Sequence, residues 1–430
     1  ENNDNFYQTR LLNFKSPINE RRLSDSERLL WNAYQFFQNK VSIKFKNKSG
    51  GELAKFLNHV IGELMMFIQI TVKDELNAYT VFETLNSRGV ELTSTDLLKN
   101  FLFSLVAKSK TDLKNVKNQW KKIIDAVGLK EFPIFLRYYL VATRKQITKE
   151  YLFKEIKSFI KNAEDVFDLL DSLEFYAYNY IALGNSDDQL WNTDKELRIN
   201  INVLKAFRVT QWKPLALVAY EKLSNQDFKK LINAIVSISF RYNVVAKLQT
   251  NEMEKVYSKA AINLYKGNTQ NLQMVINDLK SIYVNDEDFR NYFMTKQFRT
   301  ANSTEQKLAR YTLYKLESQE NNGNSYDFTI DDGTIEHILP ENPSEDWLEF
   351  FDEESIEKYI YSVGNLTLLE AKKNNREASN KIFSEKERIY HTSKFAITKN
   401  ITYPEWNQET IKNRQAHLSK LATGIWKVQY

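Results

Sequence analysis

One short string constrains this chain more than any other feature. It reads TIEHILPEN at 334–342 and holds the only His-x-x-Pro of the chain, His337 to Pro340. VGNLTLL follows at 363–369 and KKNNREASNKIFSEK at 372–386. Apolar runs, a glycine turn and then a Lys/Asn-rich stretch give an order of strand, turn, strand and helix. The pattern therefore predicts a small unit in which one histidine, one carboxylate and several amide side chains come together.

These residue types suit the hydrolysis of a phosphodiester. The attacking water must lose a proton near neutral pH, and histidine is the side chain that titrates closest to that range. A hard cation such as Mg²⁺ or Mn²⁺ prefers oxygen ligands and keeps several waters, so one carboxylate and one amide oxygen can hold it. We expect His337 to be the base, Glu336 to supply the carboxylate, and Asn365 to brace the loop that carries the histidine. The amide ligand has three candidates: Asn374, Asn375 and Asn380.

Length and composition bound the protein class. At 430 residues the chain exceeds one typical core, so two or three domains are expected. The absence of cysteine excludes disulfides and thiolate zinc sites. We find no apolar segment long enough to span a bilayer and no signal peptide, and we expect a cytoplasmic protein. Because the chain begins with Glu1 rather than methionine, we interpret it as a fragment or a processed protein.

Charge is distributed unevenly near the histidine motif. The net charge is only +5, but residues 327–357 contain twelve Asp/Glu and no Lys/Arg, whereas 370–427 contain twelve Lys/Arg and six acids. An acidic loop near a metal and a basic face behind it fit a site that grips a phosphate backbone. Ordinary solvated helix faces explain either half alone about as well. We expect double-stranded DNA as the partner and no membrane, and we leave open a homo-oligomer.

A second distinctive string, YTVFETLNSRGVELTSTDLLKNFLF, occupies residues 79–103. It predicts a short helix, a turn through Arg88 and Gly89, and a second helix that carries Leu98 and Phe101 on one face. A glycine turn between two helix termini can hold an anion, although a plain packing unit explains the same pattern more simply.

The remaining chain is predicted to be helical from 104 to about 319. The segment ENNGNS at 320–325 is the best linker candidate, because this composition favours turns. Alternating Tyr326, Phe328 and Ile330 predict a strand that leads into the histidine motif. We therefore predict domains at 1–103, 104–323 and 324–430.

Over roughly residues 326–427 these motifs resemble the HNH, or ββα-metal, endonucleases. The resemblance implies Glu336 as first metal ligand, His337 as general base, Asn365 as the loop-bracing asparagine and Asn375 as helix ligand. The following spacing, from Asn380 and Phe383 to Lys386, is typical of the branch found in GmrSD-type modification-dependent restriction enzymes. Many HNH nucleases carry a four-cysteine zinc knuckle. This chain has no cysteine, so its ββα unit must be held by packing alone.

The 79–103 string is similar to the FE-x-LN-x-RG-x-x-L-x-x-x-D signature that ends the ParB-like N-terminal domain of GmrSD-type proteins. In that family the domain binds and hydrolyses nucleotide and helps to sense modified DNA. The resemblance makes Asn86, Arg88 and Asp96 candidate nucleotide contacts. The family's upstream Asp-Gly-Gln-Gln-Arg motif does not occur in the chain. We therefore expect a nucleoside triphosphate to be used only by an intact protein that carries the missing half.

The sequence thus predicts a mainly α protein: a multi-helix body with a small C-terminal α+β domain of the HNH-like ββα-metal type. The expected function is a metal-dependent DNA endonuclease of a bacterial restriction system that acts on foreign, modified DNA. The alternative is a non-catalytic helical DNA-sensing or scaffold protein with an inactive HNH unit. A nucleotide-switch ATPase or GTPase is disfavoured by the missing upstream motif.

Overall fold

A computed structural model of the protein describes residues 4–17, 19–66, 94–324 and 326–429. It is mainly α-helical, with a single two-stranded sheet among these residues, which confirms the predicted fold class. No helix in the described ranges combines the length and apolar character needed to cross a membrane. Contacts group the chain into two units, Glu1–Lys73 and Asp74–Tyr430, which are described separately. Short 3₁₀ and π helices are labelled η.

The first unit is a set of helices with a small apolar core. In α2 the start is fixed by a capping box, in which the Glu27 carboxylate accepts from the Ser24 backbone N–H at 2.8 Å. Among the described residues of this unit, Phe6, Leu11 and Trp31 form the buried cluster. Its elements are α1 (Asp4–Phe6), η1 (Tyr7–Leu11), η2 (Glu20–Arg22), α2 (Asp25–Phe45), α3 (Gly50–Lys55) and η3 (Phe56–Glu63).

The second unit begins with a helical body, as predicted for 104–319. Helix α5 buries Leu98, Phe101 and Leu102, in agreement with the second predicted helix of the 79–103 string. The first half of that string lies outside the described residues. The elements of the body are α5 (Ser94–Val106), α6 (Lys110–Val127), α7 (Phe132–Thr143), η4 (Lys149–Tyr151), α8 (Leu152–Phe159), α9 (Ala163–Ala182), η5 (Gln189–Trp191), α10 (Lys195–Ala206), α11 (Lys213–Lys222), α12 (Asn225–Ser239), η6 (Phe240–Val245), α13 (Thr250–Tyr265), α14 (Leu272–Asp278), η7 (Lys280–Ile282), α15 (Asp286–Met294) and α16 (Ser303–Glu320).

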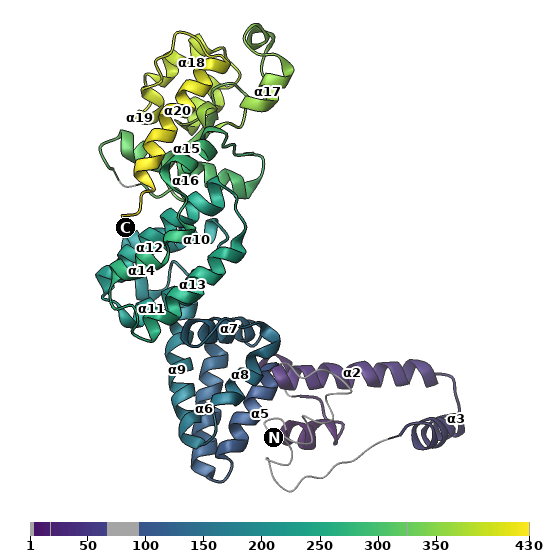
Figure 1. Ribbon diagram of the computed structural model, residues 1–430. Helices are drawn as coiled ribbons and strands as arrows, with labels where there is room; N and C mark the ends of the chain where they lie inside the picture. Colours follow the sequence, from purple (N-terminus) through teal and green to yellow (C-terminus); the bar gives the residue numbers. More distant parts are fainter. Residues whose placement is uncertain (1–3, 18, 67–93, 325, 430) are drawn as a thin grey trace. The chain divides into compact units, whose positions relative to one another are not determined.

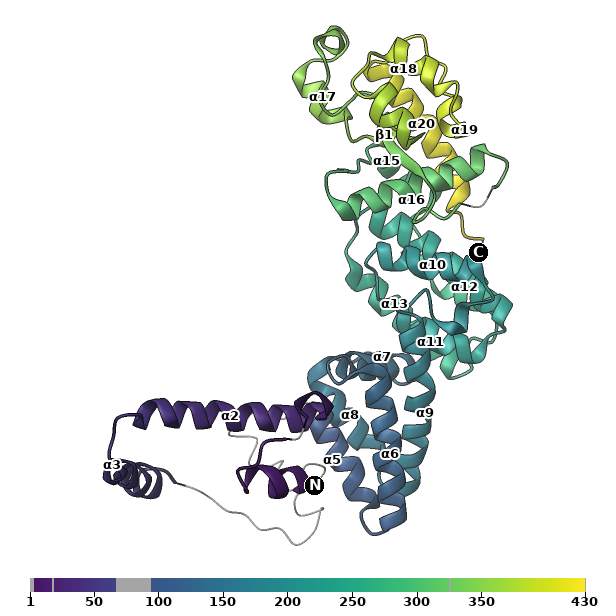
Figure 2. The same cartoon turned by 180° about the vertical axis from the view of Figure 1, so that it is seen from behind.

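Amphipathic spacing explains how these helices pack. In α6 the residues Val116, Trp120, Ile123 and Val127 recur on one face and are all buried. That helix runs beside α9, and α7 crosses near their ends, between them and the α11–α13 pair (Figures 1 and 2).

The histidine motif forms an antiparallel strand pair that starts later than the alternation predicted. β1 begins at Gly333, and His337 at its end pairs with Leu366 of β2. The predicted strand over Tyr326–Ile330 is wrong: this stretch is a turn. Its carbonyls fold around the Arg310 guanidinium, which donates to the backbone of Phe328 at 3.0 Å and of Asp331 at 2.7 Å. The elements are β1 (Gly333–His337), η8 (Glu345–Glu349), α17 (Glu353–Tyr359), η9 (Val363–Asn365), β2 (Leu366–Glu370), η10 (Lys373–Ala378), α18 (Phe383–Tyr390), α19 (Ala396–Lys399) and α20 (Gln408–Ile425).

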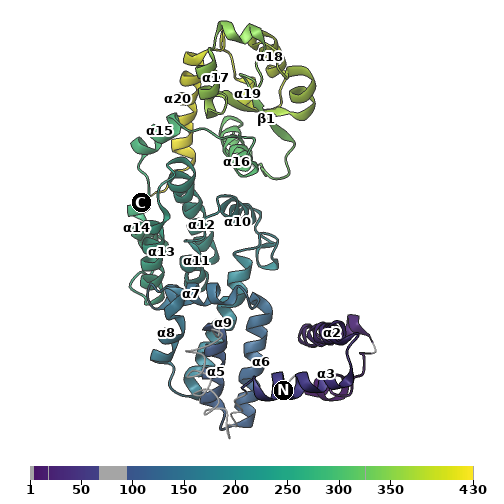
Figure 3. The same cartoon turned by 90° about the vertical axis from the view of Figure 1, so that its right-hand side faces the viewer.

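The two faces of the strand pair are covered by different parts of the chain. Neighbouring residues of a strand point to opposite faces. Leu366 and Leu368 belong to the large core shared with the helical body, whereas Leu369 belongs to a separate cluster that includes Phe383 of α18. Helix α16 packs on the first face, as Figure 3 shows. A Cβ at Gly333 would lie 2.6 Å from the Tyr314 hydroxyl of α16, so only glycine allows this approach.

The C-terminal helix ties the strand pair to the body. α20 runs beside α15 and α16 (Figure 3). The fully buried Arg241 donates to the Trp426 carbonyl at 2.6 Å and to the Thr423 carbonyl at 2.9 Å. The Phe240 and Trp426 rings stack at 3.8 Å. The buried core therefore continues across the domain boundary predicted at 323/324, which itself stays a prediction.

Candidate active site

His337 lies at the end of β1 with its imidazole largely enclosed. Its side chain is 14% exposed. The Nε2 atom lies 3.0 Å from Thr300 Oγ1 and 3.7 Å from Glu341 Oε1. The Tyr361 ring packs edge-on against the imidazole, with centroids 5.9 Å apart. Three separate segments thus surround the base candidate: the α15–α16 connection, the loop after β1, and the segment after α17.

Burial controls the protonation of this histidine. Desolvation lowers the pKa of the His337 imidazole to about 4, and the nearby Lys386 ammonium acts in the same direction. The Glu341 carboxylate opposes this shift. The imidazole is therefore neutral at pH 7, which is the form that accepts a proton.

Asn365 fixes the loop that follows the histidine. The side chain is fully buried. Its Oδ1 accepts from the Leu339 N–H at 2.8 Å and from the Trp406 indole at 3.0 Å. Its Nδ2 donates to the carbonyls of Leu339 and Ile360, both at 2.9 Å. All four hydrogen-bonding positions of the amide are used, so its orientation is fixed and it holds the backbone two residues beyond His337.

Glu336 points to the opposite face of the strand and lies in what we call the Glu336 cluster: Glu336, Lys386 and Tyr390. The carboxylate residue is 3% exposed, and its Oε1 accepts from Lys386 Nζ and from the Tyr390 hydroxyl, both at 2.7 Å. Lys386 Nζ also donates to the His337 carbonyl at 2.8 Å. Burial raises the pKa of Glu336 and lowers the pKa of Lys386, while their mutual attraction opposes both shifts.

The three asparagine candidates have different environments. Asn374 is half-buried in η10, and its Nδ2 donates to Thr334 Oγ1 at 2.9 Å and to the Ile335 carbonyl at 3.0 Å. It therefore braces η10 against β1. Asn375 and Asn380 are exposed. Ser379, directly before Asn380, has a φ of 37° and ends the π turn.

The nucleotide candidates are described only in part. Asn86 and Arg88 lie outside the described residues. Asp96 lies in the first turn of α5, at the start of the helical body. The geometry of these three residues as a set therefore stays a prediction.

Sequence reasoning passed over three residues of the enclosed histidine site. Glu341 lies within the TIEHILPEN string and carries the acid that His337 faces, so its i,i+4 spacing was a usable signal. Tyr361 precedes the VGNLTLL string. Thr300 lies 37 residues upstream in an unremarked connection, and only tertiary packing brings it to the imidazole.

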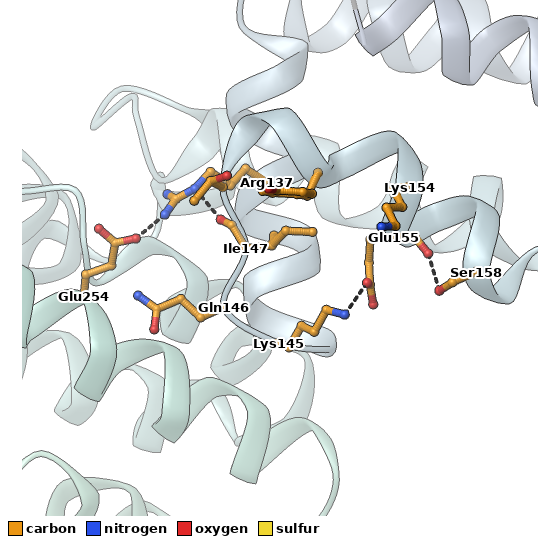
Figure 4. A pocket seen from close by; sticks show the side chains of 10 residues that line it. Arg137, Lys145, Gln146, Ile147, Lys154, Glu155, Ser158 and Glu254 are labelled. Atoms are coloured by element: carbon orange, nitrogen blue, oxygen red, sulfur yellow. Dashed lines mark hydrogen bonds and ion pairs between the residues drawn. The ribbon is translucent and has the colours of Figure 1, made fainter.

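A cavity lies away from these residues, in the helical body. It has a volume of about 820 Å³ and is lined by residues of α7, α8 and α13 and of the 145–151 connection. Figure 4 shows four of its charged side chains in two ion pairs: Arg137 with Glu254, and Lys145 with Glu155 at 2.5 Å. None of the site residues predicted from sequence lines it. Size alone does not make it the centre of the expected chemistry.

Comparison with known families agrees with both motif-bearing regions. The model described as "GmrSD restriction endonucleases, C-terminal domain" matches residues 283–421. The model described as "GmrSD restriction endonuclease, N-terminal domain" matches residues 1–103. No curated protein matches the chain significantly. The C-terminal match includes Thr300 as well as the strand pair.

Proposed function

The chain belongs to the GmrSD restriction endonuclease family, and from this premise we propose that it is an HNH-type endonuclease that hydrolyses DNA phosphodiesters with His337 as general base. Membership of the family supports a DNA endonuclease of restriction defence. The HNH assignment rests on the arrangement of β1, β2 and the following helices around His337. The chemistry rests on the residues of that site.

One observation carries the proposal: a neutral, enclosed imidazole at a strand end whose following loop is fixed by a fully bonded asparagine. Neutral His337 can take a proton from a water whose oxygen attacks the phosphorus, while a DNA oxygen leaves. Asn365 keeps the backbone that carries the base in one place. A fixed base lowers the entropic cost of reaching the transition state.

A divalent cation, Mg²⁺ or Mn²⁺, remains part of the proposal as the group that would absorb charge on the phosphate. Glu336 does not fit as its ligand in the arrangement described above, because the residue is 3% exposed and its charge is already paired with the buried Lys386 ammonium. Among the described residues no group of three or more His, Asp or Glu side chains gathers in a way that could hold a metal. Asn375 and Asn380 keep exposed amides that can reach an ion. No step is therefore assigned to Glu336.

Charge at the surface supports double-stranded DNA as substrate. Beyond Pro340 the chain exposes acids that repel phosphate, including Glu345 and Asp346. The opposite sign occurs around η10 and α18, where Lys372, Arg376 and Arg388 are exposed. We propose that the DNA backbone lies along this basic side. We also propose that base modification is recognised by parts of the chain other than the strand pair.

A plasmid-nicking assay with Mg²⁺ or Mn²⁺ tests the function. The parent protein should convert supercoiled plasmid to nicked or linear DNA, and EDTA should stop the reaction. His391→Ala is the matched control for His337→Ala, because His391 is an exposed histidine of the same region. Modified and plain plasmids in parallel test the substrate preference. A parent protein that binds DNA but never cuts it would favour the scaffold alternative.

A further inference from the structure

The imidazole of His337 contacts a hydroxyl and a carboxylate that also contact each other. Thr300 Oγ1 lies 3.0 Å from His337 Nε2 and 3.3 Å from Glu341 Oε1. The same carboxylate oxygen lies 3.7 Å from Nε2. The Tyr361 hydroxyl bonds the Glu341 side chain as well. We call Thr300, His337 and Glu341 the His337 cluster.

The chemistry of these groups fixes the direction of the hydrogen bonds. An ionised carboxylate can only accept, so the single hydroxyl hydrogen of Thr300 goes to Glu341. Thr300 Oγ1 must then accept from His337, which requires a hydrogen on Nε2. If the Thr300 hydroxyl donated to Nε2 instead, the carboxylate oxygen of Glu341 would face lone pairs on both Oγ1 and Nε2. The contact of one ring nitrogen decides the state of the other.

We propose that Thr300 and Glu341 are positioning residues, which hold His337 as the Nε2–H tautomer and leave Nδ1 as the atom that accepts the proton. The inference rests on the proposed function for its catalytic meaning. It adds that the helical body completes the site, because Thr300 belongs to the α15–α16 connection and to neither strand. Positioning means here that both residues act through the imidazole.

Backbone contacts keep Thr300 in place. The Phe298 N–H donates to the Tyr361 carbonyl at 2.9 Å, and the Val363 N–H donates to the Lys296 carbonyl at 3.2 Å. The connection is thus attached to the segment that also carries Tyr361, whose hydroxyl holds Glu341. The hydroxyl and the carboxylate are therefore both held beside Nε2 of the imidazole.

The charged and titratable groups around His337 determine the expected pH effects. Glu341 raises the pKa of the imidazole and Lys386 lowers it. Tyr361 also faces the imidazole, and the Arg299 guanidinium acts to lower the pKa of that tyrosine. Glu341→Gln removes the one group that raises this pKa. The acid limb of the pH–rate profile should therefore shift to lower pH, and the rate at neutral pH should fall because the base is weaker.

The tautomer can be measured directly and without any activity. The chain has only four histidines, so two-dimensional ¹⁵N–¹H correlation of the imidazoles is tractable, and the His337 signals are assigned by their loss in His337→Gln. The parent protein should show His337 with Nε2 protonated and Nδ1 unprotonated at pH 7. Thr300→Val keeps the shape but removes the hydroxyl, and should produce a mixture of tautomers. Thr300→Ser should restore the parent spectrum.

Cleavage rates supply the second readout. Thr300→Val should cut roughly 10- to 100-fold more slowly, because a mispositioned base costs rate without a loss of binding, so KM should change little. Thr300→Ser should recover most of the rate. The matched controls are Thr295→Val and Glu345→Gln, exposed residues of the same connection and the same acidic loop, and both should behave as the parent.

The outcomes separate the two proposals. An Nδ1–H tautomer in the parent protein, or a Thr300→Val spectrum identical to the parent's, overturns the positioning role whatever the nuclease assay gives. A parent protein with the Nε2–H tautomer and a Thr300-dependent spectrum, but no DNA cleavage, would leave the positioning role standing and overturn the proposed function.

Discussion

Glu336 and His337 are neighbours in one strand, yet their surroundings differ in kind. The Glu336 cluster is closed: a carboxylate, an ammonium and a phenol are all buried, and the carboxylate accepts from both of the others. The His337 cluster ends at Glu341, whose side chain is 44% exposed, so it connects to solvent. The alternation of a strand sends the two side chains to opposite faces. We therefore propose that the buried Glu336 carboxylate stabilises the fold and that the reactive chemistry belongs to His337.

The largest expected effect is on the cleavage rate, and it comes from the His337 cluster. His337→Ala should lower the cleavage rate by about 10²–10⁴-fold, the usual cost of losing a general base. Unfolding by urea should change little by comparison, because one side of the cluster already reaches solvent. Plasmid-nicking rates and urea midpoints, measured together with His391→Ala, check both statements. An unchanged rate would make His337 structural and erase the contrast between the clusters.

Changes in the Glu336 cluster should instead lower the free energy of unfolding. Lys386→Met leaves the Glu336 carboxylate buried without its cation, and we expect a loss of about 3–5 kcal/mol in the free energy of unfolding. Urea denaturation measures it, with the exposed Lys381→Met as matched control.

The double variant Glu336→Gln, Lys386→Met sharpens this test. Removing both charges should recover part of the loss, because neither partner is then left as an unpaired ion. If Glu336→Gln alone raised the Mg²⁺ concentration needed for cleavage while stability stayed the same, the carboxylate would be a metal ligand and the comparison would fail.

A third test uses pH. The folded pKa of His337, about 4, lies below the ordinary value of 6.5, so the unfolded chain binds the proton first as pH falls. The stability linked to this histidine is complete above pH 6.5 and is lost as pH drops towards 4, by about 3 kcal/mol in total. The free energy of unfolding, measured in urea and plotted against pH, should have different slopes for the parent and for His337→Gln over this window. Parallel curves would mean that burial does not keep the imidazole neutral.

The smallest effects concern the asparagines. Asn374→Ala loses two half-buried hydrogen bonds and should cost about 1 kcal/mol of stability. Asn375→Ala is exposed and should leave stability within about 0.5 kcal/mol, while raising the Mg²⁺ or Mn²⁺ concentration needed for cleavage. Metal titrations of both variants and of Asn380→Ala check this. A shifted titration for Asn380→Ala alone would move the ligand to that residue.

Local patterns allowed the helical body, the strand pair and the positions of His337 and Asn365 to be predicted. Period and motif spacing are properties of neighbouring residues, so they can be read along the chain. The turn at 326–332 was predicted as a strand because alternation cannot reveal that Arg310 would collect its carbonyls. The pairing of Glu336 with Lys386 spans 50 residues, and that of Thr300 with His337 spans 37. Such contacts depend on which face of a strand meets which helix.

The Arg241 side chain joins the helical body to the C-terminal helix α20, and this bears on when the His337 site is complete during synthesis. Its guanidinium donates to the carbonyls of Thr423 and Trp426, which are synthesised more than 180 residues later. Until α20 has left the ribosome, the Arg241 guanidinium is held by the Val284 carbonyl and the Asp286 carboxylate but lacks its two C-terminal acceptors. The connection that carries Thr300 then also lacks the Gln415 amide that donates to the Lys296 carbonyl. We expect a nascent chain that already carries His337 to remain inert. On the proposed function, DNA cleavage would then begin only after the whole chain has been synthesised.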